Sequence, residues 1–214
     1  MFNIFKKQKG VEGKIAYYSL QNWWSSVFTE EERNHIEDVF RPMGDSPDRK
    51  SLTEGKITSS SQSAAGLLNA LAGWFDNPRD RNIAKKIIDK ATELAHKGDS
   101  VIDLHFALHV RTEIYYKERE ITPGALEEAM KACREQISIA PLAAQAFQKA
   151  YPWQSLPAHG GYTQLSIILK KQGDYKKIIE LCGQAKKQGW AGDWDRRIEE
   201  AKKKLAMLAN TPKA

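Results

Sequence analysis

The sequence predicts an all-α protein built of antiparallel helical hairpins. Apolar residues recur at intervals of three and four along most of the 214-residue chain, which is the spacing of one helix face. Glycine, proline and asparagine gather between these segments, where helices are expected to end. Alternating apolar and polar runs, which mark half-buried strands, are essentially missing. We therefore expect about eight to ten helices, paired with their neighbours.

The beginning of the chain predicts two helices and then a linker. Apolar side chains at close to helical spacing predict one helix over residues 12–28. Thr29 and Glu32 have the spacing of a capping box, in which each side chain bonds the other's backbone N–H. They predict a second helix that stops before Pro42. The stretch 41–56 contains two prolines and two glycines, and we interpret it as a linker.

Two helical hairpins are predicted in the middle of the chain. The first begins after the serines of residues 59–63, turns at residues 76–78 and ends at Gly98. The second has its first helix over residues 100–118 and reaches its second helix through a longer connection at residues 121–124. Each hairpin buries an apolar face that neither helix could cover alone.

The last third of the chain predicts three further elements. An extra short helix over residues 142–151 is followed by an extended loop over residues 152–161. A hairpin over residues 159–190 then turns tightly at Gly173. After it, Asp193 begins a final helix with charged residues on its outer face.

The hairpin over residues 159–190 has a characteristic pattern of apolar and small residues. The positions that carry it are Tyr162, Leu165, Ser166, Leu169, Ile178, Cys182, Ala185 and Trp190. With the turn at residues 172–175, this pattern resembles a tetratricopeptide repeat, a helical hairpin of about 34 residues. The resemblance departs from the repeat at Ile178, where a small residue is usual, and at Trp190, where proline is usual. It extends less regularly over residues 60–190, whose hairpins follow one another at wider intervals than that period.

The resemblance implies an architecture and a general function. Residues 57–214 would form a short tetratricopeptide-like solenoid as one continuous unit, with a C-terminal capping helix. Residues 1–56 would be an N-terminal helical pair and linker. The solenoid would be an interaction scaffold for a protein or peptide, held in a groove that the first helices of the hairpins line. The polar positions expected to meet the partner are His105, His109, Glu113, Tyr116, Thr163, Lys170 and Lys171.

The positive charge of the chain leaves a second function open. The formal net charge is +6, and residues 176–214 carry ten basic and five acidic side chains. Such a local excess is either a solvated helix face or a site for an anionic partner. The alternative is therefore a basic helical protein that binds nucleic acid through its C-terminal helices. An enzyme of unknown class is the third hypothesis.

His105 and His109 are the residues to consider for metal chemistry. They lie four positions apart on one helix, a spacing that suits two zinc ligands. No HExxH motif and no second ligand cluster accompany them, and no nucleophile elbow or phosphate-binding loop occurs elsewhere. We therefore expect no catalytic residue, no metal and no cofactor, and these two histidines stay the candidates should a metal bind.

The cysteines and the hydropathy pattern bear on the compartment. Cys133 and Cys182 fall in apolar helix stripes and predict buried, reduced thiols of the kind found in cytosolic proteins. No apolar run approaches the roughly 18 residues that span a bilayer. The first ten residues lack the apolar region of a secretory signal. We therefore expect a cytoplasmic protein that does not bind membranes.

Overall fold

The computed structural model describes residues 10–44 and 50–209, which form eleven α-helices and no strand. The predicted all-α class is confirmed. The helices are α1 (Gly13–Tyr17), α2 (Gln21–Val27), α3 (Glu30–Val39), α4 (Ala64–Trp74), α5 (Arg81–Lys97), α6 (Val101–Lys117), α7 (Ala125–Ser138), α8 (Ala140–Ala150), α9 (Gly160–Gln172), α10 (Tyr175–Lys187) and α11 (Trp194–Ala209). Within the described residues, none of these helices has the length and apolar character needed to cross a bilayer.

The prediction of a single helix over residues 12–28 is wrong. The chain breaks between α1 and α2 at Ser19, whose φ of 57° lies in the left-handed region. Distant backbone bonds hold α1 in place, since the N–H of Ile15 donates to the carbonyl of Leu52 at 2.8 Å. Leu52 is fully buried, so residues 50–55 of the expected linker pack against α1. Residues 45–49 of that linker lie outside the described residues.

The capping box predicted for α3 is present. The hydroxyl of Thr29 accepts the N–H of Glu32 at 3.1 Å, and the Glu32 carboxylate accepts the N–H of Thr29 at 2.9 Å. The same carboxylate receives the ammonium of Lys86 at 2.6 Å, which ties the start of α3 to α5. The helix ends at Val39, ahead of Pro42 as predicted.

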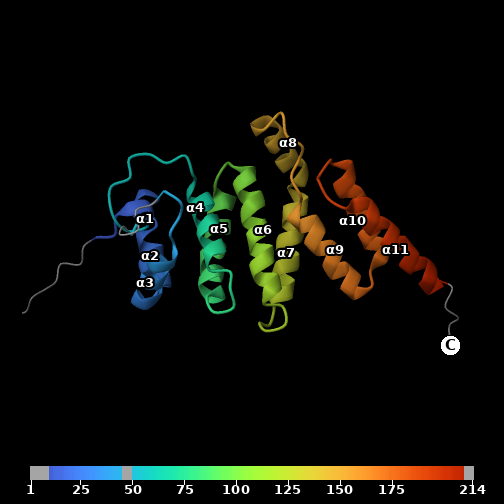
Figure 1. Ribbon diagram of the computed structural model, residues 1–214, viewed down its shortest axis with the longest axis horizontal. Helices are drawn as coiled ribbons and strands as arrows, with labels where there is room; N and C mark the ends of the chain where they lie inside the picture. Colours follow the sequence, from blue (N-terminus) through green and yellow to red (C-terminus); the bar gives the residue numbers. More distant parts are fainter. Residues whose placement is uncertain (1–9, 45–49, 210–214) are drawn as a thin grey trace, which may run out of the picture.

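From α4 onward the helices form a row. Successive helices contact each other from α4 to α8 and from α9 to α11, and α7 packs on α9 across the inserted α8. Figure 1 shows this row along the longest axis of the molecule, with α8 projecting from one side of it. Besides its sequence neighbours, α6 contacts α4, α8 and α9, so it has more helix partners than the other helices described in the row.

The interior holds two large apolar clusters. The first has its members between residues 15 and 114, so it joins the N-terminal helices to α4, α5 and one end of α6. The second has its members between residues 133 and 201 and lies among α7 to α11. Ile114 belongs to the first cluster, while Val101 and Ile102 pack against the second. Helix α6 therefore connects the two halves of the core.

The last hairpin folds as its sequence predicts. Gly173 adopts a left-handed φ of 75° and ends α9, and the Asp174 carboxylate accepts the N–H of Lys177 at 3.3 Å to begin α10. Leu165 of α9 and Ile178 of α10 are buried in the same cluster. Cys182 is buried there too, and both cysteines are free thiols whose pKa is raised by burial to about 11.

Candidate functional site

The structure places His105, the first of the predicted groove residues, in the interior. Its exposed fraction is only 2%, and its ring stacks on Trp190 at 5.4 Å between centroids with an interplanar angle of 7°. The edge of Phe147 closes another side at 5.3 Å. His105 therefore cannot meet a partner at the surface, contrary to the expectation from its helix face. The cause is that α8 and α9 both pack over this part of α6.

His105, His109 and His159 together form a histidine cluster where α9 meets α6. The rings of His105 and His159 lie 4.9 Å apart between centroids, nearly perpendicular to each other. The Nδ1 atom of His159 accepts the N–H of Tyr162 at 3.3 Å and so caps α9. Three ring nitrogens are buried without a hydrogen-bond partner: Nδ1 of His105, Nδ1 of His109 and Nε2 of His159.

Burial keeps the two inner members of the histidine cluster neutral. It is the main cause that lowers the pKa of His105 to about 4 and that of His159 to about 3, and the neighbouring histidines add to it. Within residues 10–44 and 50–209, no group of three or more His, Cys, Asp or Glu side chains is placed to hold a metal ion. His105 and His109 thus have no third ligand there.

Gln136 of α7 connects the two helices that meet at the histidine cluster. Its Nε2 donates to the carbonyl of His105 at 2.8 Å, and its Oε1 accepts the N–H of Gly161 at 2.7 Å. One fully buried amide therefore joins α6, α7 and the start of α9. These contacts make the region a structural joint that holds the start of α9 against α6 and α7.

The other predicted partner-binding residues of α6 and α9 lie in two separate regions of the surface. His109 and Glu113 have side chains that are 37% and 51% exposed, and their closest N and O atoms are 3.9 Å apart. Tyr116 contacts the Lys171 ammonium, which lies 5.5 Å from its ring centroid. The structure thus brings Tyr116 and Lys171 together, although they come from different hairpins. Thr163 is half-buried in α9.

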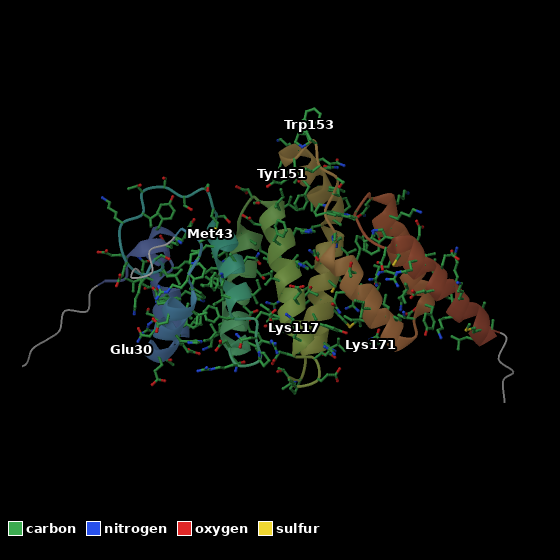
Figure 2. The ribbon with its side chains drawn as sticks, in the orientation of Figure 1. Glu30, Met43, Lys117, Tyr151, Trp153 and Lys171 are labelled. Atoms are coloured by element: carbon green, nitrogen blue, oxygen red, sulfur yellow. The ribbon has the colours of Figure 1, made fainter. Side chains whose placement is uncertain are left out.

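Lys170 and Lys171 line an open groove of about 790 Å³ between α9 and α11, with α10 as its base. Figure 2 shows Lys171 near the end of α9, beside the end of α6 that carries Lys117. The apolar side chains of the groove are Ile167, Tyr175, Ile178, Ala201 and Met207. Its basic side chains are Lys170, Lys171, Arg196, Arg197, Lys203 and Lys204. Among the described residues that line it, Glu200 is the one acid.

Polar contacts connect the two walls of the groove. The Lys170 ammonium lies 2.9 Å from the Glu200 carboxylate, which also receives Arg196 at 2.7 Å. Lys170 first, and then Arg196, holds the pKa of Glu200 below its ordinary value. Arg197 donates to the Ser166 hydroxyl at 2.8 Å. Lys170 and Arg197 thus link α9 to α11 across the groove.

The contribution of α11 to the groove is what the sequence reasoning missed. Arg196, Arg197, Lys203 and Lys204 stand three to four positions apart around Glu200, which places them on one face of the helix. The positive excess of residues 176–214 was the signal for this face. It could not show that α9 lies opposite, because that depends on how the hairpin packs.

The groove joins an apolar base to a basic rim on rigid helices. Such a surface can bury the apolar side of a ligand while it pairs with negative charges at the ligand's edges. Its rim side chains are largely exposed, so it is accessible to a macromolecule. No family model, no curated protein and no solved structure matches this chain.

Proposed function

We propose that the protein is a tetratricopeptide-like interaction scaffold that binds a segment of a partner protein between α9 and α11. The observation that carries this proposal is the groove itself, with its apolar base and charged rim. In the tetratricopeptide-like interpretation, α9 is the first helix of the last hairpin and α11 is the capping helix that follows it, and first helices present the binding surface in such arrays. Lys170 and Lys171 are then contact residues, and Tyr116 supports Lys171 from α6.

The form of the groove favours a polypeptide over a small molecule. Small-molecule sites enclose most of the ligand surface. Here the rim residues Lys170, Lys203 and Lys204 are exposed and the groove opens to solvent along α11. A ligand that fills it would be covered on one side and continue beyond it, as a segment of a longer chain does.

Nucleic acid is the second candidate, and the six basic side chains of the groove favour it. Proteins that bind single strands pair such charges with aromatic side chains on which the bases stack. Tyr175 is the one aromatic residue among the described lining residues, and it is half-buried. Phosphate contacts also give a steep loss of affinity with salt. A salt titration with a labelled oligonucleotide therefore separates this function from peptide binding.

A display library of random peptides tests the scaffold function. The full-length wild-type chain should enrich a family of peptides, and Lys170→Glu should lose that family because it reverses a charge on the groove wall. Lys202→Glu is the matched control, since Lys202 lies on α11 outside the groove and pairs with Glu199. Glu113→Lys reports whether the contact surface extends from α9 onto α6.

Two results would contradict the proposal. One is that no peptide is enriched above background. The other is that Lys170→Glu keeps every peptide while Trp153→Ala loses them. Trp153 is 96% exposed at the end of the α8 projection (Figure 2), so that result would move the interaction surface away from the groove.

A further inference from the structure

The groove between α9 and α11 carries more positive charge than its own side chains neutralise. Asp193 pairs with Arg196 and Arg197 at the start of α11. Lys203 and Lys204 have no ion-pair partner among the described residues, and both are exposed. An anionic ligand would meet these free ammonium groups along one wall.

Glu200 shows where a carboxylate sits in this groove. It receives Lys170 from one wall and Arg196 from its own helix, at 2.9 and 2.7 Å. Hydrogen bonds of this kind, between charged donors and a carboxylate, are stronger than neutral ones. A carboxylate from a partner would have the same two cations to bind if Glu200 moved aside.

The lining residues also indicate the conformation of the ligand. The backbone N–H groups of an extended peptide need acceptors, which a strand edge or amide side chains supply and lysine or arginine side chains do not. The described part of the chain contains no strand, and no asparagine or glutamine lines the groove. A helical ligand satisfies its own backbone and needs only an apolar base and complementary charges.

We infer that the groove binds an acidic amphipathic helix of a partner protein and that Glu200 competes with the carboxylates of that helix. This inference rests on the proposed function of the groove. The lining residues of α11 run from Arg196 to Met207, which corresponds to about 16 Å or three turns of a ligand helix. The apolar face of the ligand covers Ile167 and Tyr175, which are half-buried at the base of the groove. Its carboxylates face Lys170 on one wall and Lys203 and Lys204 on the other.

Three synthetic helices of about 15 residues, with one common apolar face, test the charge preference. Their polar faces carry glutamate, glutamine or lysine, and binding to the full chain is measured by fluorescence anisotropy. The acidic helix should bind more tightly than the neutral one, and the basic one should bind least. The double variant Lys203→Glu, Lys204→Glu should weaken the acidic helix about tenfold, because two rim charges are reversed. Lys202→Glu should leave its affinity within about twofold.

Glu200→Gln tests the competition separately. It removes the internal carboxylate and leaves Lys170 without its ion-pair partner, so the acidic helix should bind several-fold more tightly while the neutral helix is unaffected. If the Glu200→Gln variant bound the acidic helix more weakly than the wild type does, the proposed competition would be wrong. Equal affinity of the neutral and acidic helices for the wild-type chain would overturn the acidic preference.

The two proposals fail in different ways. If the peptide library gives groove-dependent peptides without acidic residues, the scaffold function stands and this inference is wrong. If neither the library nor any of the three helices binds, the scaffold function itself is wrong. A single-stranded oligonucleotide that displaces the acidic helix at equal concentration would show a general anion site and would favour the nucleic-acid function.

Discussion

The imidazole of His109 leaves room only for glycine at residue 160, the first residue of α9. A Cβ atom at residue 160 would lie 2.0 Å from Nδ1 and 2.6 Å from Cε1 of that ring, far inside contact distance. We therefore expect Gly160→Ala to lower the free energy of unfolding by about 1–3 kcal/mol, as overpacking does. Alanine has the higher helix propensity, so the loss has to come from the contact with His109.

The double variant identifies that contact as the cause. In a His109→Ala background the ring is gone, and Gly160→Ala should have little effect or stabilise slightly. Urea unfolding of the wild type, both single variants and the double variant gives the coupling free energy. An equal loss in both backgrounds would show that the site of strain lies elsewhere.

Single residues also show where sequence reasoning reaches its limit. The spacing of His105 and His109 correctly places them on one face of a helix. It could not show that His159, 50 positions beyond His109, and Trp190 close over that face. A polar helix face in a sequence predicts an exposed surface, but here α9 packs on half of that face of α6 and buries it. The positions that remained at a surface, such as Lys170, are ones where no later helix packs on top.

At the scale of the elements, the features that depend on neighbouring residues were predicted, and those that depend on distant residues were not. The capping box of α3 and the turn at Gly173 depend on residues within a few positions, and both are present as predicted. The start of α1 depends on backbone bonds to residues 51–55, more than 30 positions away, and α1 ends before Ser19 in its left-handed conformation. The apolar periodicity of residues 12–28 records neither feature, so the sequence suggested one continuous helix.

Leu165 tests the packing of the α9–α10 hairpin. Its side chain is buried in the second core cluster with Ile178 and Cys182. Leu165→Ala should therefore lower the free energy of unfolding by about 2–5 kcal/mol, the range for large-to-small changes in a core. Leu142→Ala is the matched control, because Leu142 on α8 is 60% exposed and should change stability by no more than about 0.5 kcal/mol. Chemical denaturation measures both, and similar small changes would mean that the hairpin does not pack as described.

At the scale of the whole molecule, the two core clusters are linked by α6, which contributes Ile114 to the first and packs Val101 and Ile102 against the second. The first cluster holds the N-terminal helices against α4 and α5, and the second holds α7 to α11 together. The histidine cluster lies at this junction, on the side of the second core cluster, where α9 meets α6. A change that weakens the junction should therefore act first on the C-terminal half, which carries the proposed groove.

Lowering the pH should weaken this junction, because His105 and His159 are buried as neutral groups. Burial first, and then neighbouring histidines, lowers their pKa to about 4 and about 3, whereas the unfolded chain titrates near 6.5. As the pH falls below 6.5 the unfolded state binds more protons than the folded state, so stability decreases down to the folded pKa values. By pH 5 the loss should be about 2 kcal/mol for each histidine.

Hydrogen exchange, corrected for the intrinsic effect of pH on amide rates, locates this loss within the molecule. Between pH 7 and pH 5, protection should fall in α9, α10 and α11 while α4 and α5 keep theirs, because regions with separate cores open as separate units. His105→Phe keeps an aromatic ring against Trp190 and removes one titrating group, so its loss of protection should be about half as large on a free-energy scale. A uniform decrease along the chain would show that the two clusters unfold as one unit. Unchanged protection at pH 5 would show that the histidines are accessible to water and that the joint does not depend on their neutrality.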